Sequence, residues 1–407
     1  MRDLQVGVVG GSIAGTAVAV LLARLGHQVT VFERSGHALE ERGGGIGMPI
    51  SFLDELNRQD LIDDDMPKLI PTRMVWTVRD ETSYLGRELA DLPMAMASLH
   101  WGLIFRQLLR RATDVAYRTG QEVVDVESEG AQATVTTSTG ESSTFDLVIG
   151  ADGYRSVTRS HAFPTTTPEF AGYVAWRGTI SEESQAVDFS PVEDALMISG
   201  TPRGHSPIYL IPGSDGEIAK GQRRLYWLWY SAENFPQLES LLLDLQLSST
   251  ESFAPGQVPD PLIKHLHETA LSQLPTWHAE AICLTPQPYV QPIFDLQMAN
   301  YVNGRVAVMG DAAAVARPHA AAGTTKALQD ALAMHRAFSE SGSVEEALRV
   351  YDTDRATQGR TMVSYARDVA QEHVIEAPDW SAMMPTDFRE WMSSSLMAEW
   401  PHLGPAR

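Results

Sequence analysis

The sequence has 407 residues, 43% hydrophobic and 20% charged, which is the composition of an ordinary globular protein long enough for two or three domains. Its formal net charge of −21 argues against a nucleic-acid backbone or an anionic membrane surface as a partner, because both require clustered Lys and Arg. Cys283 is the only cysteine, so no internal disulfide can form, which fits a cytoplasmic location. The apolar run 17–26 is too short to span a bilayer and lacks signal-peptide flanks, so we expect a soluble protein.

The first 34 residues predict a strand, a glycine-rich turn, a helix and a second strand. The turn, VVGGSIAG, matches the dinucleotide fingerprint G-x-G-x-x-G except that Ser12 stands at the second glycine. Serine is small, and its hydroxyl can bind a phosphate oxygen. The free N–H groups at the start of the helix attract an anion. We therefore expect cofactor contacts from Gly10, Ser12, Ile13, Ala14 and Gly15.

Glu33 ends the second predicted strand, 23 residues after Gly10. An acid at this point of a dinucleotide-binding fold accepts hydrogen bonds from the ribose hydroxyls. The alternative is a solvated glutamate at a strand end. We also expect cofactor contacts from Arg34 and, where the glycine run GGGIG follows, from Arg42 and Gly45.

The middle of the chain adds helices at 50–65 and 101–112, the second of which carries Arg106. Residues 121–150 alternate as strands with a hairpin turn, ending in a buried strand. The motif ADGYRSVTR follows directly. Asp152 in this motif is a candidate cofactor ligand, and the alternative is a turn that Asp152 caps.

Residues 170–292 change character, with aromatic strand-like runs and one clear helix, QLESLLLDL, which together predict a second domain with an antiparallel sheet. Three aromatic residues there, Tyr209, Tyr226 and Trp229, are candidates to line an apolar substrate cavity, and core packing is the open alternative. From 378 onward, Trp380, Trp391 and Trp400 lie on a predicted helix that serves packing or subunit contact, and a homodimer fits this reading.

The third motif, GDAAAVARPHAAAG, follows a buried strand near residue 308. Asp311 could accept hydrogen bonds from a polyol, or it could cap a helix. Pro318 fixes a loop, and Gly323, Thr324 and Thr325 open a long helix whose N-terminus favours negative charge.

The order of these motifs resembles that of the FAD-dependent aromatic hydroxylases, the single-component class related to p-hydroxybenzoate and salicylate hydroxylases, over residues 4–370. GYVAWRG and FRQLLRRA are also similar to family segments, and the second makes Arg106 the cofactor-contacting arginine. Ala314 stands at the usual His of the GD motif and Thr325 at the usual Asn. The pairing of GGSIAG with RPHAAAG resembles the 2,6-dihydroxypyridine hydroxylase branch.

The resemblance implies an α/β fold with a Rossmann-type FAD-binding domain built on a parallel sheet, at 1–75, 100–170 and 290–370. A substrate domain with a mostly antiparallel sheet would occupy 76–99 and 171–289, and a helical tail 371–407. Bound FAD would be reduced by NADH or NADPH as a transient co-substrate. With O₂ the reduced FAD would form a C4a-hydroperoxide that hydroxylates a phenol or a hydroxylated N-heterocycle.

By the same resemblance, His319 beside Pro318 would lie near the reacting face, where it could donate a hydrogen bond or relay a proton. Its alternative is a structural or solvent-facing histidine. No metal-ligand spacing appears in the sequence. Two other functions stay open, namely an FAD-dependent dehydrogenase or halogenase on the same scaffold, and a non-catalytic flavin-binding sensor.

Overall fold

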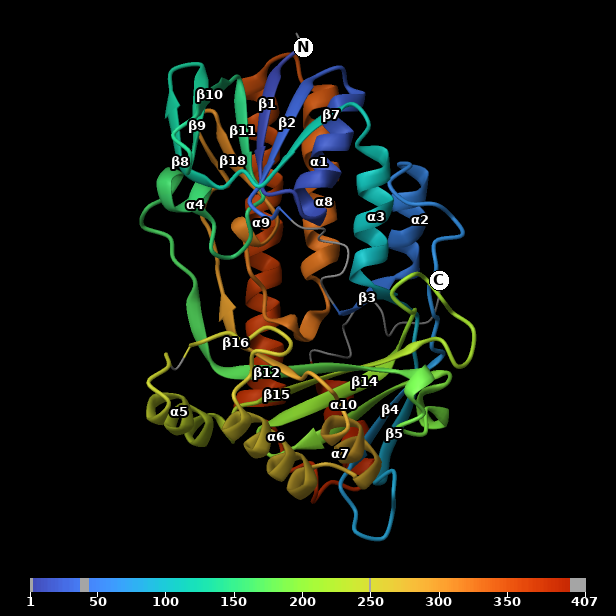
Figure 1. Ribbon diagram of the computed structural model, residues 1–407. Coiled ribbons are helices and arrows are strands. Elements are labelled where there is room, and N and C mark those ends of the chain that lie inside the picture. Colours follow the sequence, from blue (N-terminus) through green and yellow to red (C-terminus); the bar gives the residue numbers. More distant parts are fainter. Residues whose placement is uncertain (1–2, 37–43, 249, 396–407) are drawn as a thin grey trace.

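The computed structural model describes residues 3–36, 44–248 and 250–395 and stacks two sheet-based parts on each other (Figure 1). The upper part is built on a six-stranded sheet. Its strands are parallel except for the edge strand β17. In spatial order they are β17 (Val302–Asn303), β18 (Val306–Val308), β11 (Leu147–Gly150), β1 (Gln5–Val9), β2 (Gln28–Glu33) and β7 (Val115–Thr119).

Five helices belong to this upper part: α1 (Ile13–Arg24), α2 (Ile50–Arg58), α3 (Trp101–Arg111), α8 (Gly323–Glu340) and α9 (Val344–Ala370). One core unites their apolar side chains with Val6 and Val8 of β1. A three-stranded antiparallel sheet packs on the opposite face, with β8 (Val123–Glu129), β9 (Gln132–Thr137) and β10 (Ser142–Phe145). Phe145 fits there because Gly7 has no side chain, and a Cβ at Gly7 would lie 2.8 Å from its ring.

A separate two-stranded sheet is formed where β3 (Gly45–Pro49) pairs with β6 (Met96–His100). Helix α4 (Val157–Ala162) follows the strand β11 and packs against β8 in the upper part. The predicted helix at 50–65 ends earlier than expected, at Arg58.

The lower part is a seven-stranded sheet whose pairs are antiparallel except for β13 with β4. Its order is β16 (Tyr289–Asp295), β12 (Glu169–Ser181), β15 (Arg224–Ser231), β14 (Gly204–Ile211), β13 (Ala195–Thr201), β4 (Arg73–Val78) and β5 (Arg87–Pro93). The predicted combination of a parallel and a mostly antiparallel sheet is thus confirmed. The division into domains stays a prediction, and its boundaries at 75/76 and 289/290 cut through β4 and β16, which lie wholly in this sheet.

Three helices cover the outer face of the lower sheet: α5 (Phe235–Asp244), α6 (Asp260–Gln273) and α7 (Thr276–Cys283) (Figure 1). Only α5 was expected from the sequence. Helix α6 buries Leu262, Leu266 and Ala270, which recur at a helical spacing of four residues, but apart from Ile263 polar residues fill the positions between them. Helix α7 has eight residues, too few for periodicity to stand out.

The C-terminal segment packs on the edge of the lower sheet near β4 and β5. A π-helical turn (Gln371–Ile375) leads to α10 (Pro385–Ser394), and Trp380 and Trp391 contact each other with ring centroids 4.9 Å apart. The expectation that both lie on one helix is wrong, because Trp380 precedes α10 in a turn. Trp400 lies outside the described residues. Within the part of the chain that the structure describes, no helix has the length and apolar character needed to cross a membrane.

His278 on α7 joins the helical layer to the lower sheet. Its Nδ1 and Nε2 lie 3.0 Å and 2.9 Å from the hydroxyl oxygens of Ser199 and Ser206, and the ring is 1% exposed. Burial lowers the pKa of His278 from 6.5 to about 3. A histidine that must stay neutral in the folded state makes folding sensitive to acid.

We expect acid to destabilise the protein partly through His278. The unfolded chain binds the proton first, so the stability that the neutral ring contributes is complete above pH 6.5 and is lost as the pH falls toward 3. At about pH 4.5 the loss amounts to roughly 2–3 kcal/mol. Urea unfolding at neutral pH and at that acidic pH should show a smaller acid loss for His278→Asn than for wild type. An equal loss in both proteins, or an equal effect of His161→Asn at an exposed position, would contradict this assignment.

Candidate cofactor and substrate site

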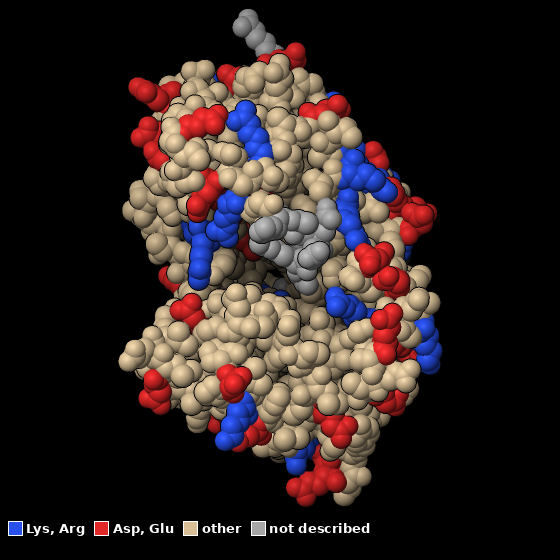
Figure 2. All heavy atoms as spheres, in the orientation of Figure 1, with Lys and Arg blue, Asp and Glu red and all other residues tan. Residues whose placement is uncertain are grey.

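The three sequence motifs meet around one cavity of about 530 Å³. The turn after β1, the end of β2, the start of α4 and the start of α8 form its wall. Figure 2 shows that the surface is hollowed between the upper and lower parts, with Lys and Arg side chains beside the hollow. Ten of the predicted cofactor residues line the cavity: Gly10, Ser12, Ile13, Ala14, Glu33, Arg34, Asp152, Asp311, Gly323 and Thr324.

The glycine turn is shaped by two close backbone approaches. Gly10 has a φ of +96°, and a Cβ there would lie 2.5 Å from the Ala151 carbonyl oxygen. A Cβ at Gly15 would lie 1.9 Å from the carbonyl oxygen of Gly10, so Gly15 serves the turn without lining the cavity. Ser12 is the N-cap residue of α1, but its side chain makes no capping hydrogen bond. Its hydroxyl and the unpaired N–H groups of the first helical turn are therefore available to an anionic ligand.

Glu33 holds this turn in place. Its Oε2 accepts a hydrogen bond from the Gly11 N–H at 2.8 Å, and its Oε1 accepts one from the Ser35 N–H at 2.8 Å. The side chain is buried, which rules out the solvated strand-end alternative. Each carboxylate oxygen keeps a further lone pair for a ligand hydroxyl.

Asp152 is both a cavity residue and a structural one. Its carboxylate accepts hydrogen bonds from the Ser156 hydroxyl at 2.5 Å and from the Thr158 N–H at 3.0 Å, which fixes the start of α4. Burial raises the pKa of Asp152, and these hydrogen bonds oppose the shift. Arg159 donates from Nη1 to the Ala312 carbonyl at 3.1 Å, so the second and third motifs are joined directly, a role that the sequence did not reveal.

A buried ionic network fixes the third motif. The Lys326 ammonium donates to the Gly310 carbonyl at 2.7 Å and lies 2.7 Å from the Asp330 carboxylate. Asp330 also accepts from the Gly310 N–H at 2.9 Å and from Arg355 Nε at 2.7 Å. The network holds Gly310 at a φ of +57° and so places Asp311 at the cavity wall.

The Asp311 carboxylate is available to a ligand. No hydrogen bond to it occurs within the described residues, so it caps no helix there. Desolvation by the surrounding protein raises the pKa of Asp311. The positive charge of Lys326 opposes this shift, and the negative charge of Asp330 adds to it.

Four of the predicted cofactor residues do not line this cavity. Arg106 donates to the Ser214 carbonyl and pairs with Asp215, so it fastens α3 to the loop between β14 and β15. Gly45 lies against two tyrosines, since a Cβ there would come within 2.4 Å of the Tyr226 ring and 2.7 Å of the Tyr209 hydroxyl. Thr325 and Gly15 each follow a residue that lines the cavity but do not line it themselves. The Thr325 Oγ1 is buried and has no hydrogen-bond partner among the described residues. Arg42 lies outside the described residues.

The two tyrosines lie on the face of the lower sheet that turns toward the upper part. Tyr209 and Tyr226 are directly paired across β14 and β15, and their ring centroids are 5.6 Å apart. Both are buried. The structure is compatible with substrate contact by these residues, which stays a prediction.

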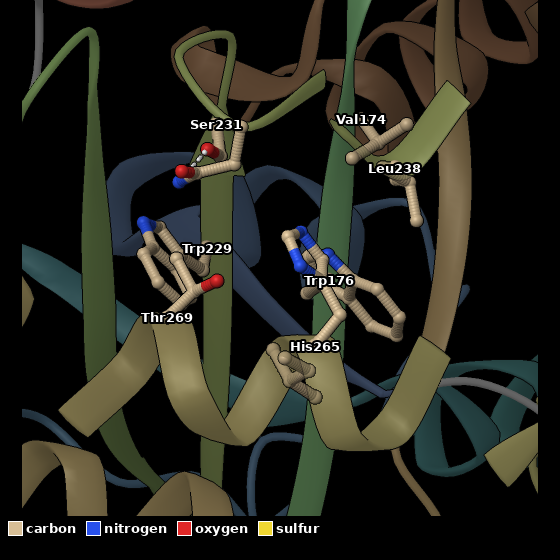
Figure 3. Close-up of a pocket in the computed structure, with 9 residues that line it drawn as sticks. Val174, Trp176, Trp229, Ser231, Leu238, His265 and Thr269 are labelled. Carbon is tan, nitrogen blue, oxygen red and sulfur yellow. Dashed lines mark hydrogen bonds between the residues drawn. The ribbon is translucent and has the colours of Figure 1, made fainter. Parts of the chain in front are cut away.

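The assignment of Trp229 to the same cavity is wrong. Tyr226 and Trp229 are three residues apart on one strand, so their side chains point to opposite faces of the sheet. Trp229 lies on the outer face near α6, beside Trp176 and Thr269 (Figure 3). The cavity left there, about 10 Å³, is too small for an organic ligand.

His319 lies on the inner side, in the short helical turn that begins at Pro318. Its Nε2 is 2.6 Å from the Tyr173 hydroxyl, and its ring lies 4.3 Å from the Tyr230 ring centroid. The residue is 7% exposed, so it does not face solvent. Burial lowers the pKa of His319 well below 6.5, which keeps the ring neutral, and Nδ1 has no partner within the described residues.

Comparison with known proteins finds monooxygenases and hydroxylases among the relatives of this chain. Residues 8–40 match the family described as NAD(P)-binding Rossmann-like domain, and residues 170–295 match the FAD binding domain-like family. The chain is 28% identical to 2,6-dihydroxypyridine 3-monooxygenase of Paenarthrobacter nicotinovorans over 90% of both chains. It is 26% identical to a salicylate hydroxylase of Pseudomonas putida, covering 86% of this chain and 81% of the relative.

Solved structures of related enzymes have the same fold as this chain. The structure of 2,6-dihydroxypyridine-3-hydroxylase from Arthrobacter nicotinovorans superposes with a TM-score of 0.81 at 25% identity, over 93% of this chain and 94% of the other. HpxO of Klebsiella pneumoniae, complexed with FAD and uric acid, has a TM-score of 0.74 at 19% identity over 99% and 98%, which shows the shared fold. The resemblance to FAD-dependent aromatic hydroxylases that the motifs indicate is confirmed.

Proposed function

We propose that this relative of the FAD-dependent aromatic hydroxylases binds FAD and uses NADH or NADPH with O₂ to hydroxylate a phenolic or hydroxylated N-heteroaromatic small molecule. The observation that carries the proposal is the meeting of all three motif loops at one cavity. Similarity to 2,6-dihydroxypyridine and salicylate hydroxylases supports the reaction type. A cytoplasmic location and a homodimer stay predictions from the sequence.

The residues around the cavity fit FAD. The side-chain-free turn at Gly10 and Gly15 and the first N–H groups of α1 suit a pyrophosphate, and Glu33 suits a ribose. Gly323 and Thr324 bring the N-terminus of the 18-residue helix α8 to the same cavity, where its dipole favours an electron-rich ring. The Asp311 carboxylate accepts no hydrogen bond within the described residues, so it is free to accept hydrogen bonds from the hydroxyls of the ribityl chain of FAD.

When bound, FAD accepts hydride from the nicotinamide and activates O₂ for transfer of one oxygen atom to the substrate ring. The chain itself must exclude water, orient the ring and manage the proton of the substrate hydroxyl. His319 is suited to the last task. Its ring is neutral, and its Nε2 is hydrogen-bonded to the Tyr173 hydroxyl. Its Nδ1 has no hydrogen-bond partner within the described residues. A change of tautomer can therefore move a proton between the two ring nitrogens.

The proposal predicts a yellow protein as purified, with a flavin spectrum that bleaches when NADH or NADPH is added without oxygen. Bleaching should be slow when no aromatic substrate is present and faster when a phenol or hydroxypyridine is added. Absorbance in an anaerobic stopped-flow instrument measures both rates. A colourless protein that gains no thermal stability from added FAD would refute the proposal.

Glu33→Ala should weaken FAD binding about 10- to 100-fold, because the substitution removes a carboxylate that bonds the glycine turn and faces the cavity. Fluorescence titration of the apoprotein with FAD measures the change. Glu33→Gln keeps the shape and one acceptor oxygen, so it should fall between wild type and Glu33→Ala. Unchanged affinity in Glu33→Ala would show that the ribose assignment is wrong.

A further inference from the structure

Helix α3 brings one tryptophan to the cavity that the three motif loops surround. Trp101 is the first residue of this helix, and it lines the cavity together with the glycine turn and Asp311. The side chain of His100 caps this end of the helix, because its Nδ1 accepts a hydrogen bond from the Gly102 N–H at 3.1 Å. The backbone at Trp101 is therefore held firmly at the cavity wall.

The indole of Trp101 is fixed on one side and open on the other. It stacks on Phe105, one helical turn further along, with ring centroids 5.4 Å apart and ring planes 19° apart. Phe105 is 2% exposed and belongs to the upper core, so it anchors the indole there. The rest of the Trp101 side chain is only partly covered by protein.

Other aromatic side chains offer no such surface to the cavity. Among the described residues, only Trp101 and Trp391 are partly exposed tryptophans, and Trp391 packs on Trp380 in the C-terminal segment. Phe32 also lines the cavity, but it is 2% exposed and lies edge-on to Phe145. An aromatic ring left open at a ligand cavity is a typical contact surface for the ligand.

Trp101 lies at the side of the cavity nearest the lower sheet. Its N–H donates to the Gly44 carbonyl at 3.1 Å, and a Cβ at Gly44 would lie 2.4 Å from the Tyr226 ring of that sheet. Figure 1 shows this end of α3 beside β3 and above the lower sheet. The flavin ring must reach this side to act on a substrate, whereas the ribose acceptor Glu33 ends a strand of the upper sheet.

Arg106 cannot make the same contact. It follows Trp101 by five residues, which places it about 140° further around the helix axis. Its guanidinium donates to the Ser214 carbonyl and pairs with Asp215, outside the cavity lining.

We propose that Trp101, rather than Arg106, is the contact of α3 with FAD, and that its indole packs against the flavin half of the cofactor. This inference rests on the proposed function, because it assigns a further residue to the same cofactor site. Covering the open indole surface with the bound cofactor stabilises the complex.

Two ligands of the apoprotein locate the contact. FAD contains both halves of the cofactor, whereas ADP contains only the adenosine and the pyrophosphate. Trp101→Leu should weaken FAD binding about 3- to 10-fold and leave ADP binding unchanged, because ADP does not reach the indole. Arg106→Met is the matched control on the same helix and should bind both ligands as wild type does. Calorimetric titration measures all of these affinities.

Emission of the bound flavin gives a second readout, which a purely structural role of Trp101 would not change. An indole in contact with an excited flavin gives it one electron and takes the electron back, so emission is lost without net reaction. A phenylalanine ring does not donate an electron in this way. Trp101→Phe should therefore bind FAD nearly as tightly as wild type but with brighter flavin emission. Trp391→Phe, outside the cavity, should leave the emission unchanged.

Three results would overturn the inference, namely unchanged FAD affinity in Trp101→Leu, an equal loss of ADP affinity in that variant, or unchanged flavin emission in Trp101→Phe. Each of these results leaves the proposed function standing. A wild-type protein that binds no FAD would refute the proposed function, and the inference with it.

Discussion

Asp330→Ala should destabilise the protein by about 3–5 kcal/mol, one of the largest effects that we expect from a single substitution. The carboxylate is fully buried and pairs with both Lys326 and Arg355 at 2.7 Å. Its removal leaves two buried cations without the carboxylate that neutralises them and the Gly310 N–H without an acceptor. Since the same turn carries Asp311, FAD binding should weaken as well. Urea unfolding of the apoprotein and an FAD titration measure the two effects.

The matched control is Asp354→Ala. Asp354 is partly exposed, with 35% of its side chain accessible, and lies 4.0 Å from Arg355 and 3.4 Å from Arg336. Exposed ion pairs contribute about 1 kcal/mol or less, so this variant should remain close to wild type. If Asp330→Ala were no less stable than Asp354→Ala, the buried network would not be what holds the third motif.

Gly15→Ala should cause the largest loss of FAD affinity among single-methyl changes, about 10- to 100-fold. The added Cβ would stand 1.9 Å from the Gly10 carbonyl oxygen, so the turn and the first turn of α1 must move apart. The N–H groups that face the cavity move with them. FAD content after purification and a titration of the apoprotein measure the effect.

Gly342→Ala provides the control for an added methyl group, because the nearest atom to its Cβ would be the carboxylate of Glu346 at 3.7 Å, an ordinary contact. This variant should keep full FAD content. Normal FAD affinity in Gly15→Ala would show that the glycine turn does not bind the pyrophosphate.

The sequence predicted the upper sheet and the three motif loops well, because each depends on local signals. A short β-branched strand, a glycine turn and an apolar, almost fully buried helix form within about 30 residues, and Glu33 ends the second strand as expected. Strand alternation alone separates Trp229 from Tyr226, since residues three apart on a strand face opposite sides of the sheet. Helix α7 was not recognisable, because it has only eight residues.

Other features depend on contacts between distant segments. The sequence shows Lys326 and Asp330 four residues apart on a helix, a spacing typical of exposed pairs, but not that both are buried. Arg106 looks like a cofactor ligand on its own helix, and its partners Ser214 and Asp215 are about 110 residues away. Such facts follow only from how the two sheets meet.

Oxygen transfer with isotopically labelled O₂ tests the central claim most directly. The protein, NADH or NADPH, labelled O₂ and a panel of phenols and hydroxypyridines are incubated together, and the products are analysed by mass spectrometry. We predict substrate-stimulated consumption of the nicotinamide and a ring-hydroxylated product that carries one labelled oxygen atom. Nicotinamide consumption that no aromatic compound stimulates, or a product whose new oxygen comes from water, would contradict it.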